Sequence, residues 1–191
     1  MRKIIYLLTK NLGKILAAKK SFSKYNLELK MLDEKYEEIQ ADTSLEIARH
    51  AAVSVSKKLK LPVIREDHSL FINELGFPGP YTKYIESRLS AEKLITLLKE
   101  DRKGYFEIAA VYAEPNGLIK EFVFRVPIKI SKVIRGTRGN WNRVLMLENS
   151  SKTFAESTEE ENLDVWNKNF EEIAKFLIQK NEKENTIIYC T

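Results

Sequence analysis

Three short segments of the sequence carry side chains that could act on a phosphorylated ligand. The first, residues 9–14, follows an apolar run and precedes a helical pattern, and it offers Thr9, Asn11 and Lys14. The N-terminus of a helix attracts anions because its free backbone N–H groups and the helix dipole favour negative charge. The segment lacks the spacing of the glycine-rich phosphate loop, so it predicts either an anion site or an ordinary polar turn.

The second segment supplies carboxylates, Glu66 and Asp67, and a third acid, Glu38, lies in a polar stretch earlier in the chain. Asp67 follows an apolar strand pattern, and the carboxyl ends of strands are where open α/β sheets bind ligands. Mg²⁺ commonly takes one or two carboxylates together with substrate phosphates, and a carboxylate can also deprotonate a water. These acids therefore predict a magnesium site with a base, or else surface carboxylates paired with Arg65 and nearby lysines.

The third segment, residues 76–81, has two glycines and two prolines in its first five positions. Proline fixes the backbone φ angle and glycine allows a positive φ, so these residues predict a rigid loop. Loops of this kind near a charged strand end often form walls of binding sites.

Hydrophobic spacing predicts the elements that position these segments. Thr43 and Glu46 form a capping box that begins a helix, and residues 114–117 form the turn of a hairpin. Strands are expected at 4–8, 26–32, 61–64, 70–75, 105–112, 118–126, 128–134 and 144–147, and further helices at 14–22, 81–88, 91–100 and 162–181. This order predicts a mixed α/β protein with parallel and antiparallel pairing, in one domain over residues 1–181 with a C-terminal tail over 182–191.

Length and composition set the broad class of the protein. The chain has 191 residues, of which 43% are hydrophobic and 31% charged, with a formal charge of +5. These values exclude disordered, collagen-like and disulfide-scaffold classes. The single cysteine, Cys190, fits a reducing interior, and no apolar run approaches the ~20 residues of a membrane span. We therefore expect a soluble cytoplasmic protein with no membrane partner.

Positive charge is concentrated at the N-terminus, where residues 1–30 hold eight basic side chains and one acid. This bias predicts an anionic partner, either nucleic acid or phosphate, or else a solvated lysine face. The basic region has few interleaved aromatic residues and no recognised nucleic-acid-binding motif. A phosphate ligand is therefore favoured over a nucleic-acid partner.

The three segments together resemble the inosine triphosphate pyrophosphatase (Ham1) family, whose members hydrolyse non-canonical purine nucleoside triphosphates. The family motif Ser/Thr-x-Asn-x-x-Lys is matched by residues 9–14, and its Glu-x-Gln by Glu38–Gln40. Its Asp-Ser/Thr-x-Leu is approximated by Asp67–Leu70, and its Thr-x-Ala-Glu is matched by Thr153–Glu156. These matches follow the family order along most of the chain.

The resemblance implies an elongated, two-lobed α/β fold with a long mixed β-sheet flanked by helices, a homodimer, and Mg²⁺ as the cofactor. It also implies hydrolysis between the α- and β-phosphates, which gives a nucleoside monophosphate and pyrophosphate. The implied site residues are Thr9, Asn11 and Lys14 on the triphosphate, Glu38 and Asp67 on the metal with Asp67 also activating the water, and Ser69, Trp141 and Asn142 on the substrate.

The chain departs from the family pattern in phosphate binding. The family's lysine in the helix before the Asp67 strand falls on Ala51, with Arg49 and His50 nearby as possible substitutes. Arginine suits phosphate geometry, and a cluster of arginines could replace lost phosphate contacts: Arg135, Arg138 and Arg143.

A second departure concerns the base. The family's Phe-Gly-Trp-Asp-Pro becomes residues 139–143, which keep Trp141 but carry Asn142 in place of the acid. Its Ser-His-Arg becomes residues 165–167, where Trp166 has the helical spacing of a core or dimer contact. Because an amide donates as well as accepts hydrogen bonds, the preference for a 6-oxo purine is expected to be altered.

Three functions remain open at this point. The first is a Mg²⁺-dependent nucleoside triphosphate pyrophosphatase with altered or relaxed base choice. The second is a divergent relative that binds nucleotides with little or no turnover. The third is a nucleic-acid-binding module that uses the basic N-terminal face. The intact carboxylates Glu38 and Asp67 favour the enzyme.

Overall fold

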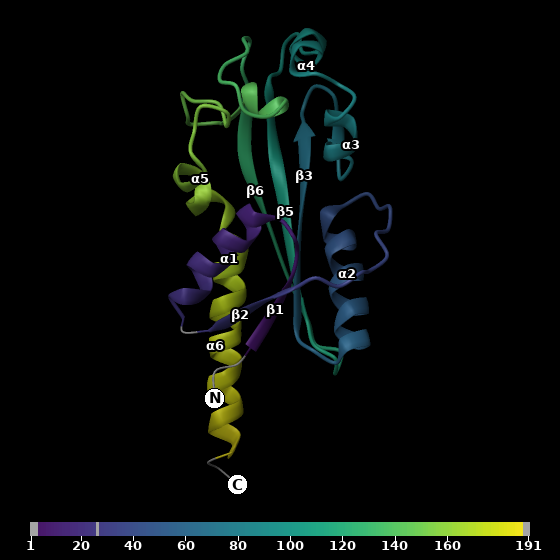
Figure 1. Cartoon of the computed structure of the whole chain (residues 1–191), viewed down its shortest axis with the longest axis vertical. Coiled ribbons are helices and arrows are strands. Elements are labelled where there is room, and N and C mark those ends of the chain that lie inside the picture. The colour runs from purple at the N-terminus through teal and green to yellow at the C-terminus, as the bar shows by residue number, and fades with distance from the viewer. Residues whose placement is uncertain (1–3, 26, 189–191) are drawn as a thin grey trace.

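The computed structural model describes residues 4–25 and 27–188, in which seven strands form one mixed sheet flanked by helices (Figure 1). The strands are β1 (Ile4–Leu8), β2 (Glu28–Leu32), β3 (Val63–Ile72), β4 (Phe77–Gly79), β5 (Lys103–Ala113), β6 (Ile119–Ile130) and β7 (Leu145–Leu147). The helices are α1 (Leu12–Ser23), α2 (Ser44–Leu59), α3 (Thr82–Glu86), α4 (Ala91–Leu97), α5 (Glu159–Trp166) and α6 (Lys168–Ile188), with a 3-10 turn at Trp141–Arg143.

The sheet has the order β2-β1-β3-β5-β6-β7, and β4 pairs with β3 beside this path. β1 is parallel to both β2 and β3, whereas the pairs from β3 to β7 are antiparallel. The expected mixed α/β fold is therefore confirmed. The hairpin of β5 and β6 and the capping box of Thr43 and Glu46 are also present.

Two hydrophobic cores lie along the same face of β3. Ile64 belongs to a core built with α1 and α6, and Leu70 and Ile72 belong to a second core built with α4 and Trp141. In Figure 1, α4 lies at the upper end of the long strands, α1 lies beside their middle, and α6 runs from there past their lower end. Because alternate residues of a strand share a face, Glu66 and His68 lie between the two cores.

The opposite face of β3 packs against α2. Val63 contacts a cluster that includes Leu8, Ala51 and Val55, with Tyr36 at its margin. Arg65 and Asp67 follow Val63 on this face by the same alternation. The charged centre of β3 thus presents different side chains to α1 on one face and to α2 on the other.

One edge of β3 is open in its middle. β1 pairs with β3 at Val63 and Ile64, and β4 pairs with it from Leu70 onward. In the described part of the chain, no strand pairs with this edge between these two points. Among the described residues, the backbone of residues 65–69 therefore has no strand partner on this edge, and Lys14 Nζ binds the Glu66 carbonyl there.

The structure differs from several expected boundaries. Residues 77–79 form β4 instead of lying wholly in a loop, because they pair with β3. β3 itself continues through residues 65–69, and the strand expected at 128–134 is the end of β6, which stops at Ile130. The helix expected at 162–181 is two helices separated at Asn167, and α6 continues to Ile188 through the start of the expected tail. Cys190 lies outside the described residues.

None of the helices in residues 4–25 and 27–188 is both long enough and apolar enough to cross a membrane.

Candidate active site

Two cavities lie at the open centre of β3. The smaller cavity has a volume of about 340 Å³ and is lined by Glu66 and by the start of α1. The larger cavity has a volume of about 820 Å³ and is lined by Arg65, Asp67 and the segment around Glu38. His68 lines both cavities. They therefore meet beside the open edge of the strand.

The turn before α1 contributes Asn11 and Lys14 to the smaller cavity. The Asn11 side chain caps α1, because its Oδ1 accepts hydrogen bonds from the N–H groups of Gly13 (2.9 Å) and Lys14 (3.3 Å). Thr9 Oγ1 accepts the Asn11 N–H at 3.1 Å. Thr9 does not line either cavity in the described structure, and it shapes the turn that brings Asn11 and Lys14 to the site.

Lys14 is joined to the centre of β3. Its Nζ donates a hydrogen bond of 2.9 Å to the Glu66 carbonyl and lies 3.7 Å from Glu66 Oε2. The side chains are 14% and 1% exposed. Burial lowers the pKa of the Lys14 ammonium, although the charges of Glu66 and Asp67 oppose this shift.

Glu66 is an ionised acid in a buried position. Burial acts to raise its pKa, but the contacts with His68, Lys14 and Arg65 together outweigh burial and hold the pKa below its ordinary value. Its Oε1 is buried and has no hydrogen-bond partner in the described structure. A buried acceptor of this kind is costly, so the smaller cavity is suited to a ligand that donates a hydrogen bond.

Aromatic rings form another wall of the smaller cavity. Trp166 stacks on His68 with a ring-centre distance of 5.8 Å and an angle of 24° between planes. Phe106 and Phe154 pack against the same indole at 5.4 Å and 5.8 Å. Flat apolar walls of this kind suit planar ligands such as nucleobases. Trp166 was expected to be a core or dimer contact. It packs against the second core, and it also lines the smaller cavity.

Trp141 and Asn142 have different positions despite being neighbours. Asn142 lines the smaller cavity, whereas Trp141 is 1% exposed and donates its indole N–H to the Leu89 carbonyl at 2.8 Å. Trp141 thus packs in the core, and the substrate contact expected of it stays a prediction. Asn142 is the residue of the pair that a ligand can reach.

In the larger cavity, Asp67 is oriented by the beginning of α2. Ser44 Oγ donates a hydrogen bond of 3.1 Å to Asp67 Oδ2 and also pairs with the Ser69 hydroxyl. Ser69 is fully buried and lines neither cavity in the described structure. Ser69 thus bonds to Ser44, which in turn bonds to Asp67, and the substrate contact expected of Ser69 stays a prediction.

Arg65 also faces Asp67. Its Nη1 donates to the Leu8 carbonyl at 3.2 Å, and its Nη2 lies 3.6 Å from Asp67 Oδ1. The guanidinium carbon lies 5.3 Å from the centre of the Tyr36 ring. Tyr36 in turn donates its hydroxyl to Glu38 Oε1 at 3.3 Å.

The donor set of the larger cavity fits Mg²⁺. Glu38 and Asp67 reach one cavity from different elements, and carboxylate oxygens are the ligands of hard cations. No cluster of three or more His, Cys, Asp or Glu side chains that could hold a metal occurs in the part of the chain that the structure describes. Two carboxylates with the remaining positions left to water and phosphate suit Mg²⁺, which retains several waters.

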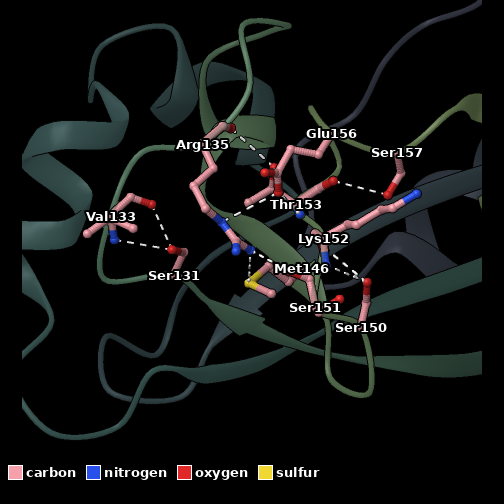
Figure 2. A network of polar contacts seen from close by, with 10 residues as sticks. All are labelled: Ser131, Val133, Arg135, Met146, Ser150, Ser151, Lys152, Thr153, Glu156 and Ser157. Atoms are coloured by element: carbon pink, nitrogen blue, oxygen red, sulfur yellow. Dashed lines mark hydrogen bonds and ion pairs between the residues drawn. The ribbon is translucent and has the colours of Figure 1, made fainter.

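The arginines that were expected to replace lost phosphate contacts mainly donate hydrogen bonds to backbone carbonyls of neighbouring loops. Figure 2 shows Arg135 donating to the Ser151 carbonyl at 2.7 Å, with Glu156 3.4 Å away. Glu156 also accepts from the N–H and hydroxyl of Thr153. The Thr-x-Ala-Glu segment is thus part of a structural brace. Arg143 is paired with Glu92.

Two other candidate cations have different surroundings. Arg138 lines the smaller cavity and donates to the carbonyls of Phe154 and Ser157. Arg49 pairs with Glu121 and lines neither cavity in the described structure, and Ala51 is buried. Arg49 therefore does not replace a cation at the site.

The fold and sequence agree with those of known proteins. The family model described as "Ham1 family" matches residues 5–176. A dITP/XTP pyrophosphatase of Methanopyrus kandleri is 35% identical over 161 residues, which cover 82% of this chain and 86% of that protein. Another dITP/XTP pyrophosphatase, from Saccharolobus solfataricus, is 34% identical over 94% of this chain and 96% of its own length.

A solved structure supports the same fold. The structure of a HAM1 protein from Coxiella burnetii superposes with a TM-score of 0.72 at 20% identity, covering 93% of this chain and 99% of that one. The match in fold, the family model and the relatives that share about a third of their residues lead to one assignment. The chain belongs to the Ham1 family.

Proposed function

We propose that this protein hydrolyses non-canonical purine nucleoside triphosphates to a nucleoside monophosphate and pyrophosphate. One observation carries the proposal: a candidate phosphate turn and a pair of magnesium-type carboxylates meet at the open centre of β3. The relatives named dITP/XTP pyrophosphatase support the same reaction and the same class of base.

The phosphate chain is assigned to the turn before α1 and to the larger cavity. Asn11 fixes the turn, and Lys14 supplies a positive charge to the triphosphate. Glu38 and Asp67 would hold Mg²⁺, which would neutralise charge on the phosphoryl oxygens. Phosphoryl transfer depends mainly on positioning and charge neutralisation, and these are the functions that the four side chains can perform.

Asp67 is also the proposed base. It takes a proton from the attacking water, whose oxygen bonds to the α-phosphorus as the bond to the bridging oxygen breaks. Pyrophosphate leaves with that oxygen. Ser44 keeps the Asp67 carboxylate in a fixed orientation through its hydrogen bond, which lowers the cost of reaching the reactive geometry.

The base is assigned to the smaller cavity. Trp166 offers a flat surface, and Asn142 offers an amide that can donate and accept hydrogen bonds. Asn142 stands where the family pattern has an acid, and its amide oxygen can accept a hydrogen bond from the base as that acid would.

Nucleotide binding with little turnover is the second candidate. It is favoured by the loss of a cation at Ala51, which is buried, and by the engagement of Arg49 with Glu121. The nucleic-acid hypothesis has less support, because N-terminal lysines form ion pairs with acids: Lys10 with Asp33, Lys20 with Asp164, and Lys24 with Glu171.

Pyrophosphate release from inosine, xanthosine, guanosine, adenosine and pyrimidine triphosphates, with and without Mg²⁺, tests the enzyme. Release that is fastest with inosine or xanthosine triphosphate and depends on Mg²⁺ is expected. Nucleotide binding without release would favour the second candidate. Full activity of Asp67→Asn would contradict the assignment of the base and metal ligand.

The homodimer implied by the resemblance also belongs to this proposal. Size-exclusion chromatography coupled to light scattering is expected to give a mass near twice 22.2 kDa. A single-chain mass at micromolar concentration would contradict it.

A further inference from the structure

Arg65 is a permanent positive charge held inside the larger cavity. Its side chain is 13% exposed and shares the cavity with Asp67 and Glu38. Arginine retains its charge in all ordinary protein environments. A buried guanidinium therefore needs hydrogen-bond acceptors for several N–H groups at once.

The structure supplies only part of these acceptors. Nη1 donates to the Leu8 carbonyl, whereas the distance of 3.6 Å from Nη2 to Asp67 Oδ1 is longer than a hydrogen bond. Nε is buried and has no hydrogen-bond partner in the described structure. A guanidinium has five N–H donors in a rigid fork, so Arg65 has donors available for a further ligand.

The position of Arg65 indicates what that ligand is. Its bond to the Leu8 carbonyl places the guanidinium at the end of β1, immediately before the turn of Thr9 to Lys14. On its other side lies Asp67. Arg65 therefore stands between the turn assigned to the triphosphate and the carboxylates assigned to the metal.

We propose that Arg65 is a phosphate-binding residue, which donates to oxygens of the β- and γ-phosphates and of the pyrophosphate product. The assignment rests on the proposed function for its substrate, but its chemistry is that of arginine, whose planar fork matches phosphate oxygens. The Arg65 N–H groups that have no hydrogen-bond partner in the described structure, Nε among them, would be donors to the phosphate. Arg65 thereby supplies a positive charge at the phosphates. Ala51, at the position of the family's lysine, has no charge, and Arg49 is paired with Glu121.

Binding of inorganic pyrophosphate measured by calorimetry, in EDTA and in Mg²⁺, tests this proposal without turnover. Arg65→Gln is expected to weaken binding about tenfold or more, the effect of losing hydrogen bonds to a charged group. Arg49→Gln is the matched control, because this arginine pairs with Glu121 outside both cavities, and its affinity is expected to equal that of the wild type. Equal affinities of folded Arg65→Gln and wild type would overturn the proposal, as would absence of pyrophosphate binding by the wild type.

A second measurement applies if Arg65→Gln does not fold. The Arg65 Nε–H resonance of ¹⁵N-labelled wild-type protein, assigned by its loss in Arg65→Lys, is expected to shift as pyrophosphate is added. An unchanged resonance at saturating pyrophosphate would overturn the proposal. If the protein turns over nucleotides and Arg65→Gln binds pyrophosphate normally, this proposal fails and the proposed function stands. If pyrophosphate binding depends on Arg65 but no triphosphate is turned over, the phosphate-binding role of Arg65 stands and the proposed function fails.

Discussion

Lys14 on α1 donates a hydrogen bond of 2.9 Å to the backbone carbonyl of Glu66 in β3. β1 has already ended at this level of the sheet and β4 has not yet begun to pair. The ammonium therefore binds an acceptor on the open edge of β3. The same side chain brings positive charge to the smaller cavity, so one residue serves both the fold and the candidate site.

Lys14→Met should reduce both stability and substrate affinity. It leaves Glu66 buried without its ammonium partner, which should lower the free energy of unfolding by about 3 kcal/mol. Denaturant unfolding measures this loss, and pyrophosphate release measures the accompanying rise in KM. The control is Lys20→Met, which breaks an exposed pair with Asp164 and should change stability by less than about 1 kcal/mol. Equal stabilities of the two variants would contradict the structural role of Lys14.

The two tryptophans should separate ligand binding from packing. Trp166→Leu keeps an apolar side chain but removes the stacking surface, so KM for inosine or xanthosine triphosphate should rise about tenfold. Trp141→Phe removes one of the two donors to the Leu89 carbonyl, the other being Asn140 Nδ2, and reduces the volume of a buried side chain, so it should lower the free energy of unfolding by about 1–3 kcal/mol. Steady-state kinetics and denaturant unfolding of both variants check the contrast. A change in KM at Trp141 with none at Trp166 would reverse our assignment.

The sequence was sufficient to predict elements that depend on local chemistry. Thr43 and Glu46 fix the start of α2 through bonds within one turn, and residues 114–117 form the hairpin between β5 and β6. It could not predict β4, because Phe77 pairs with Ile72 only after the chain has turned back at a glycine with φ of 66°. The break at Asn167 was missed because apolar spacing continues across it.

The site was predictable in part for the same reason. The order of the motifs predicted that Glu38 and Asp67 act together. Both line the larger cavity, although they come from separate elements. Trp166 packs against a core as its helical spacing predicts, but that spacing carries no sign that the side chain also lines the smaller cavity. Arg65 was interpreted as a surface partner of carboxylates, since only the tertiary structure shows that it is buried between Leu8 and Asp67.

Ser44→Ala should lower kcat while leaving the protein folded. Loss of the hydrogen bond from Ser44 Oγ frees Asp67 to rotate, and loss of such a supporting contact at a metal ligand commonly costs about tenfold or more. Kinetics over a range of Mg²⁺ concentrations measures kcat and the Mg²⁺ requirement together. Ser54→Ala in the same helix is the control, because its hydroxyl bonds only to the Ala51 carbonyl among the contacts of the described structure. A Ser44→Ala variant with wild-type kcat would contradict the proposal that Ser44 orients the Asp67 carboxylate.

Glu156→Gln should weaken the loop brace of Figure 2 in a pH-dependent way. The Thr153 backbone N–H is the main cause that holds the pKa of Glu156 below its ordinary value of 4.5, with the Arg135 charge adding to the effect. A carboxyl whose pKa is lower in the folded state stabilises the fold above its unfolded pKa, and this contribution disappears as pH falls through the folded value. Wild type should therefore have a higher Tm than Glu156→Gln at pH 7, and the difference should shrink as pH falls below about 4. Thermal unfolding across this range measures the difference, with the exposed Glu160→Gln as the control. A Tm difference that stays constant down to low pH would show that the Glu156 charge has no part in the brace.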